Sequence, residues 1–151
     1  MPTLTDPADL ARLEARLNAL RPDAAPLWGK MVPGEMLCHL ADFLAQAVGK
    51  REVPDQSSLF LRTVVRFLLV NAMPMPKGAP TSPALLASRG GTLPADFEAD
   101  RERVLALMRE NAARPANRPF ARHPAFGQLS HRERGLTSWK HIDHHLRQFG
   151  V

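Results

Sequence analysis

The sequence lacks several features that define particular protein classes. It has 151 residues and one cysteine, Cys38, so no internal disulfide can form, which favours a reducing compartment. Tyrosine is absent and aromatic residues make up only 6%, so the sequence has no series of stacking residues of the kind that bind single-stranded nucleic acid. No G-x-S-x-G, Walker or G-x-G-x-x-G motif occurs, and nucleophilic catalysis by serine or cysteine is not supported.

No segment is suited to crossing a membrane or directing secretion. The most apolar stretch, 59–70, is too short to span a bilayer and contains Arg62 and Arg66. The N-terminus lacks the basic start and apolar run of a signal peptide. We therefore expect a cytoplasmic protein with no membrane partner. The net charge of +5 is scattered along the chain, so we expect no nucleic-acid partner either.

Helical spacing of apolar residues dominates the chain, and no stretch alternates like a strand. Its 44% hydrophobic and 23% charged residues are typical of one globular domain, here over 1–151. We expect a first helix that Asp6 caps and Pro22 closes, followed by helices at about 33–49, 57–71, 94–112 and 130–149. The Pro- and Gly-rich segment 73–93 is predicted to be a long crossover loop. The sequence thus predicts an all-α fold, a four-helix bundle with a long crossover connection and one extra short helix.

Histidines give the sharpest chemical signal. His141 and His145 are four residues apart in the last predicted helix, so they point the same way and can bind one ion. His39 lies at a comparable edge of the second helix. Three histidines with an open fourth position form the arrangement of a catalytic metal. Asp42, three residues after His39, is a candidate for hydrogen-bonding to a ligand histidine or for acting as a weak ligand itself.

Plainer interpretations remain open for these residues. A histidine at the border of an apolar helix face is often only hydrogen-bonded, and an H-x-x-x-H pair often arises by chance. Cys38 is predicted to be a small buried thiol on the far side of its helix from the site. On the last helix, a helical wheel places Lys140, Asp143 and Arg147 toward solvent, with the last two paired.

Three motifs, in order along the chain, resemble those of DinB-like (DinB/YfiT) proteins. The stretch 33–42, PGEMLCHLAD, resembles the helix that carries their first metal histidine. The stretch 123–130, HPAFGQLS, resembles their H-P-x-x-G-x-L-[ST] lead into the last helix, and 141–148 resembles their final H-x-x-x-H-x-x-Q. Segments 26–31 and 140–150 are most similar to an uncharacterised bacterial branch of that superfamily.

The resemblance implies a four-helix bundle with a crossover, often homodimeric. It implies that His39, His141 and His145 bind a divalent metal ion such as zinc or nickel. Members of the superfamily include metal-dependent thiol S-transferases that use a low-molecular-weight thiol such as bacillithiol, mycothiol or glutathione, and a mycothiol-dependent isomerase. His144 is an extra neighbour, either a competing ligand or a proton shuttle.

Two functions follow as hypotheses. The first is a metal-dependent enzyme, a thiol S-transferase or hydrolase acting on a small molecule, in which Asp42 or His144 moves protons and Arg134 holds an anionic substrate. The second is a non-catalytic metal-binding or structural module. A closed site with His144 or Asp42 as fourth ligand would favour the second hypothesis.

Overall fold

The protein is all-α, as the sequence predicts, in a computed structural model that describes residues 1–151. Its elements in chain order are α1 (Pro7–Ala19), α2 (Pro33–Ala47), the π-helical turn η1 (Leu61–Val65), α3 (Arg66–Asn71), the 3-10 turns η2 (Pro83–Leu85) and η3 (Ala87–Arg89), α4 (Phe97–Ala112) and α5 (His131–Gln148). None of these helices combines the length and the apolar character needed to cross a bilayer.

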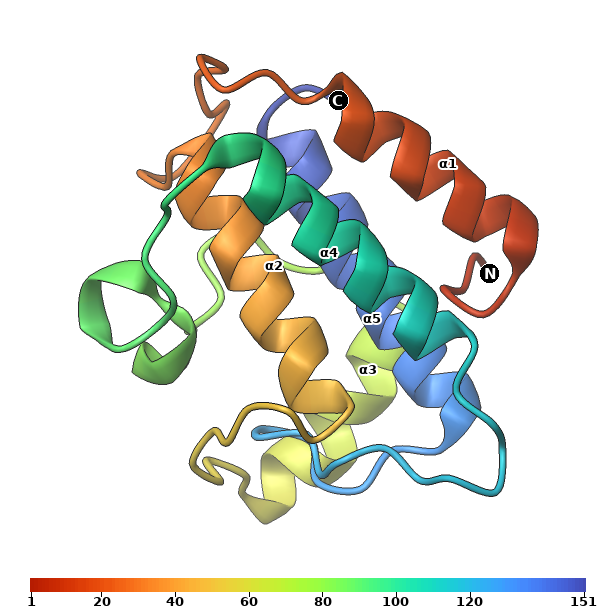
Figure 1. The fold of residues 1–151 in the computed structure, drawn as a ribbon. Helices are drawn as coiled ribbons and strands as arrows, with labels where there is room; N and C mark the ends of the chain where they lie inside the picture. The colour runs from red at the N-terminus through yellow and green to blue at the C-terminus, as the bar shows by residue number, and fades with distance from the viewer.

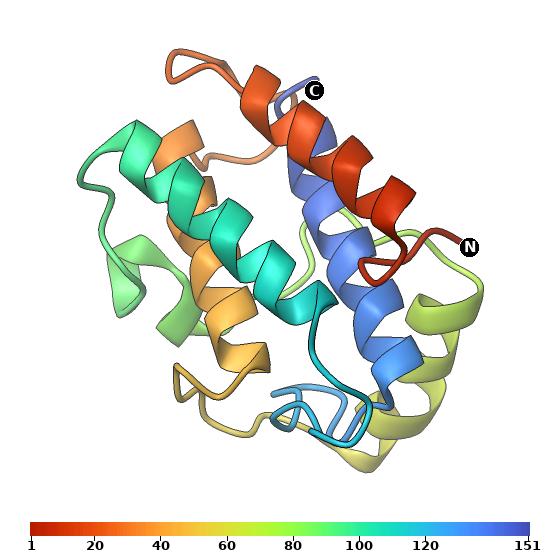
Figure 2. The ribbon, with the colours of Figure 1, turned by 45° about the vertical axis from the view of Figure 1, so that its right-hand side comes forward.

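The four long helices, α1, α2, α4 and α5, lie side by side (Figures 1 and 2). Helices α1 and α5 run in one direction, and α2 and α4 run in the opposite one. Because α2 and α4 are parallel neighbours, the chain between them must return over the whole length of the helices. Residues 48–96 make this return, and they carry η1, α3, η2 and η3. The crossover expected from the sequence is therefore present, and it places η2 beside α2.

Capping residues set the helix ends. Asp6 accepts hydrogen bonds from the backbone N–H groups of Ala8 and Asp9, as expected of an N-cap. Ser130 and Glu133 form the predicted capping box at the start of α5. The prediction for α4 was wrong at its start, since the helix begins at Phe97 rather than near residue 94. Asp96 is its cap, and the proline before it lies outside the helix.

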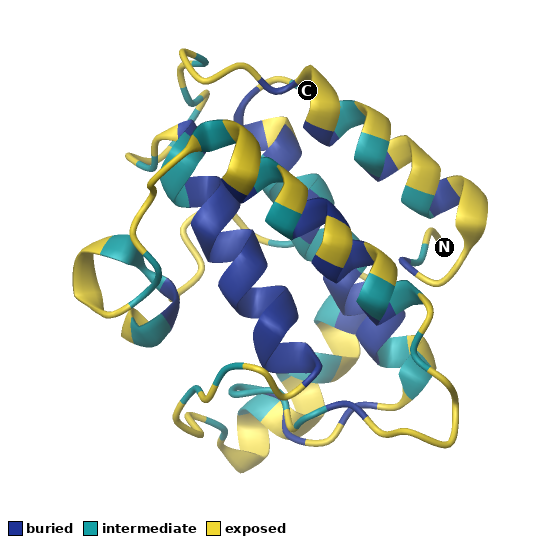
Figure 3. Cartoon of the chain, viewed as in Figure 1, coloured by how far each residue is buried: buried dark blue, intermediate teal, exposed yellow.

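The segment before α3 is helical from residue 59, with a π turn at Leu61–Val65 rather than the regular helix expected over 57–71. Its apolar side chains are largely exposed, and this face has no covering element (Figure 3). The exposed side chains are Leu59, Phe60, Val64, Phe67 and Leu68. The homodimer that the family resemblance implies stays a prediction.

Helix α2 lies at the centre of the molecule, and every residue from 36 to 47 is buried (Figure 3). Most belong to one core cluster of 21 residues drawn from all four long helices. A helix buried on every side must satisfy its polar side chains inside the protein. His39, Asp42 and Gln46 are the polar side chains concerned, and their partners define the functional region.

Candidate metal centre

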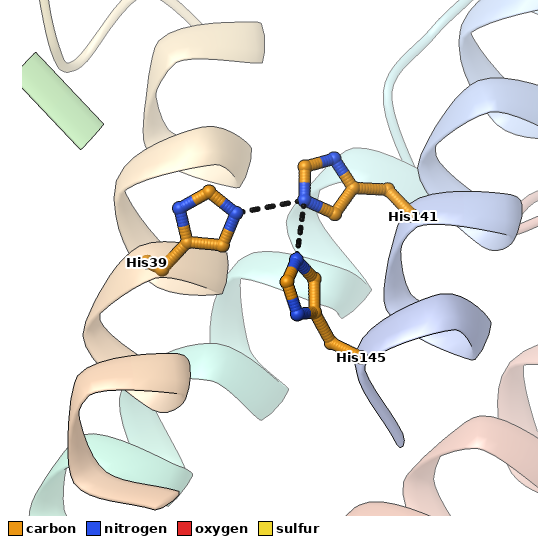
Figure 4. Close-up of side chains that lie close together, drawn as sticks. All are labelled: His39, His141 and His145. Atoms are coloured by element: carbon orange, nitrogen blue, oxygen red, sulfur yellow. Dashed lines mark hydrogen bonds between the residues drawn. The ribbon is translucent and has the colours of Figure 1, made fainter. Parts of the chain in front are cut away.

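Helices α2 and α5 bring three histidines together (Figure 4). His39 is buried, whereas His141 and His145 are half-buried. His39 Nε2 lies 2.8 Å from His141 Nε2, and His145 Nε2 lies 3.1 Å from the same atom. Because His141 and His145 are four residues apart on α5, their rings project from one helix face toward His39 on α2. One ligand atom from each of the three lies within 4.8 Å of the others.

In two of the rings, the nitrogen that does not face the other histidines is hydrogen-bonded to a protein oxygen atom. His39 Nδ1–H donates to the Leu85 carbonyl at 2.9 Å, and His145 Nδ1–H donates to Gln148 Oε1 at 2.9 Å. Gln148 in turn donates through Nε2 to the Trp28 carbonyl at 2.8 Å, which fixes the orientation of its amide. Since Nδ1 carries the proton in both rings, each Nε2 offers a lone pair toward His141.

Burial keeps all three rings neutral. It lowers the pKa of His39, lowers that of His141 well below the ordinary value, and lowers that of His145 to about 3. The neighbouring histidines lower the pKa of His141 and His145 further, because two adjacent imidazolium charges would repel each other. Neutral imidazole is the form of histidine that binds metals.

The arrangement leaves hydrogen bonding incomplete without a cation. His141 Nε2 carries at most one proton, yet it faces two Nε2 lone pairs, at 2.8 and 3.1 Å. At least one of these N···N contacts therefore has no hydrogen between the two atoms. Tetrahedral coordination at about 2.0–2.1 Å sets nitrogen ligands about 3.3 Å apart, so small outward shifts of the rings accommodate a transition-metal ion. The residues present therefore fit a three-histidine metal centre.

No fourth side chain of the metal-binding types joins the three histidines. His144 is adjacent in sequence, but its ring stands at 87° to that of His145, packs edge-on against Trp28 and interacts with the backbone of Met75. Burial lowers the pKa of His144, and the Met75 backbone partly offsets this. A metal held by the three histidines therefore keeps a coordination position for water or another small ligand.

Asp42, the candidate for orienting a ligand histidine or moving protons, makes no hydrogen bond to the histidines. Its fully buried carboxylate accepts from the backbone N–H and the hydroxyl of Thr92, both at 2.7 Å. It also accepts from Arg51 at 3.1 Å and Arg103 at 3.4 Å. Both oxygens are thus engaged by Thr92 and the two arginines, and neither bonds to a histidine. Arg51 also donates to the carbonyls of Ala84 and Gly90, so Asp42 anchors the loop that carries Leu85.

The remaining candidates have mixed placements. Arg134 lies in the interior on the same face of α5 as His141, seven residues away. Cys38 is buried outside the histidine group, and burial, with the nearby Asp100 charge, raises its pKa to about 11.

Lys140 was expected in solvent. Its Nζ instead donates to the carbonyls of Leu69, Val70 and Met73, which closes the end of α3 against α5.

Sequence reasoning assigned no role to the two groups that orient His39 and His145, although Gln148 was part of the last motif. The Leu85 carbonyl is a backbone atom 46 residues from His39, and no side-chain pattern could indicate it. Gln148 lies three residues after His145, within one helical turn, so its position alone could have suggested a hydrogen-bonding partner.

Replacing Gln148 with alanine is expected to weaken zinc binding about 10- to 100-fold, because His145 loses the acceptor that fixes its tautomer and ring orientation. A competition titration against a chelating dye measures the affinity. Gln56→Ala is the matched control, since Gln56 is an exposed residue outside the cluster. Equal affinities of the two variants would show that Gln148 does not orient the ligand.

Comparison with known proteins places the chain in a family. Residues 7–150 match the model of the family described as protein of unknown function (DUF1569). No curated protein matches the chain. No solved structure matches it either. The match covers the whole helical domain, including all three histidines of the cluster, and the chain therefore belongs to the DUF1569 family.

Proposed function

We propose that the protein is a metal-dependent enzyme in which His39, His141 and His145 hold a divalent transition-metal ion. The convergence of three neutral Nε2 atoms on one point carries the proposal, because their hydrogen bonding is incomplete without a cation. The resemblance of 33–42, 123–130 and 141–148 to DinB-like proteins supports the same ligands. Zinc and nickel are the proposed ions, since imidazole suits both.

The proposed reaction is transfer of a thiol to a small electrophile, or hydrolysis of a small molecule. A bound divalent ion supplies Lewis-acid chemistry, which lowers the pKa of a thiol or water at the fourth position. The Leu85 carbonyl and Gln148 fix the imidazoles of His39 and His145, so these two ligands need not reorganise. The absence of His144 and Asp42 from the cluster favours an open site over a closed structural one.

The experiment is an assay of zinc- and nickel-loaded protein with several low-molecular-weight thiols and a panel of alkyl halides, epoxides and activated esters. Thiol consumption and ester cleavage are expected to depend on the metal and to fall to background in a His141→Ala variant treated identically. Stoichiometric metal with no reaction across the panel would contradict the enzymatic proposal and favour a non-catalytic metal-binding module.

A further inference from the structure

The interior of the protein contains one buried charge with no opposite charge beside it. The Arg134 side chain is 1% exposed, and no carboxylate lies within 4.0 Å of its guanidinium. Its Nη2 donates to Gln46 Oε1 at 3.1 Å and to the Ala121 carbonyl at 3.2 Å, whereas Nε and Nη1 have no acceptor. Burial lowers its pKa to about 10, so the guanidinium stays protonated at neutral pH. Three of its five N–H bonds therefore lack a partner.

A second unpaired donor lies in the same region. His123 Nδ1 accepts from the backbone N–H groups of Ala125 and Phe126, at 3.1 and 3.2 Å. Burial, followed by the nearby Arg134 charge, lowers the His123 pKa to about 3, so the ring is neutral and its proton is on Nε2. This Nε2–H donates to no protein acceptor. Arg134 and His123 together thus present one positive charge and several N–H groups that donate to no protein acceptor.

The donors lie close to the three-histidine cluster. The Arg134 guanidinium carbon is 5.8 Å from the centre of the Phe43 ring, and the His141 ring centre is 4.2 Å from the same point. These distances place the guanidinium within about 10 Å of the His141 ring. Ser138 lies on the same face of α5 between the two, and its buried hydroxyl has no partner.

A hollow in the surface lies beside the two protein partners of Arg134. It has a volume of about 680 Å³, lies at the end of α2, and is lined in part by Gln46 and Ala121. These are the two residues whose oxygens accept from Arg134. A small molecule in the hollow is therefore separated from the guanidinium by only one layer of side chain and loop.

We propose that Arg134 and His123 bind a carboxylate group of the substrate while another part of the same molecule reaches the three-histidine centre. A single carboxylate matches the single uncompensated charge and accepts several N–H bonds at once. The inference deepens the proposed function, on which it rests for the second contact. It assigns the substrate class as small carboxylic acids whose reactive group lies within about 10 Å of the acid.

The test uses cobalt(II)-loaded protein, whose visible absorption changes when a thiol binds at the metal. The probes are 3-mercaptopropionate and its neutral analogue 3-mercapto-1-propanol. The acid is expected to bind at least about 10-fold more tightly than the alcohol, because a hydrogen bond between charged groups contributes at least this much affinity. Arg134→Met is expected to remove this preference and to leave the affinity for the alcohol unchanged, an outcome that a purely structural role of Arg134 does not produce.

Gln46→Glu serves as a second variant in case Arg134→Met does not fold. It places a carboxylate where Gln46 Oε1 already accepts from Arg134, so a charge of the protein itself balances the positive charge of the guanidinium. This variant is also expected to lose the preference for the acid. Retention of the preference in either folded variant would overturn the assignment.

The outcomes separate this inference from the metal proposal. If wild-type protein binds both thiols equally, the carboxylate site is wrong and the metal centre stands. If neither thiol changes the cobalt spectrum, the proposed function fails, and metal-free protein tests the carboxylate site alone. Acetate would then be expected to raise the melting temperature of the wild type but not of Arg134→Met, and an equal effect on both would overturn the inference.

Discussion

Replacing His141 with alanine is expected to abolish stabilisation of the protein by zinc. At 100 times the dissociation constant, a bound ligand stabilises a fold by about 2.7 kcal/mol, which raises the melting temperature of a chain of this length by roughly 5–10 °C. His141 is the most sensitive position because its Nε2 contacts the Nε2 atoms of both His39 and His145. Thermal unfolding with and without zinc measures the effect.

Two other histidines of α5 give matched controls. His131 lies at the start of the helix, where its ring contacts the Arg118 carbonyl, and His144 faces Trp28. Alanine at either position is expected to leave the zinc-dependent rise in melting temperature in place. Loss of the rise in His144→Ala together with its retention in His141→Ala would show that the ion is held by a different set of ligands.

Replacing Asp42 with alanine is expected to destabilise the metal-free protein by about 3 kcal/mol, the lower end of the range for breaking a buried ion pair. The lower end applies because Arg51 and Arg103 are 23% and 40% exposed and can turn toward water. The hydrogen bonds to Thr92 are lost as well. A loss of this size lowers the urea midpoint by roughly 1–2 M.

The same variant is expected to weaken metal binding, although Asp42 touches none of the three histidines. The loop from Ala84 to Thr92 loses its anchor, and this loop holds the Leu85 carbonyl against His39. Asp23→Ala is the control, since its exposed pair with Arg21 is not expected to change the midpoint. A midpoint for Asp42→Ala that equals the control would show that the buried carboxylate does not anchor the loop.

The sequence was most informative where function follows local spacing. The 3.6-residue period of α5 places His141 and His145 on one face of the helix. The spacing of apolar residues in α2 predicts that His39 lies at the edge of an apolar face. Capping signals at Asp6 and Ser130 were equally local, and they were confirmed. Contacts across the crossover could not be predicted, because no periodicity relates Asp42 to Thr92 or His39 to Leu85. Lys140 was placed in solvent for the same reason, since the wheel of α5 does not include α3.

The most direct test of the central claim is X-ray absorption spectroscopy of the zinc-loaded protein. The three-histidine centre predicts three imidazole nitrogens at about 2.0–2.1 Å and one further light atom, with no sulfur shell. A sulfur neighbour at about 2.3 Å, or an all-oxygen shell without imidazole scattering, would contradict the assignment of His39, His141 and His145 as the ligands.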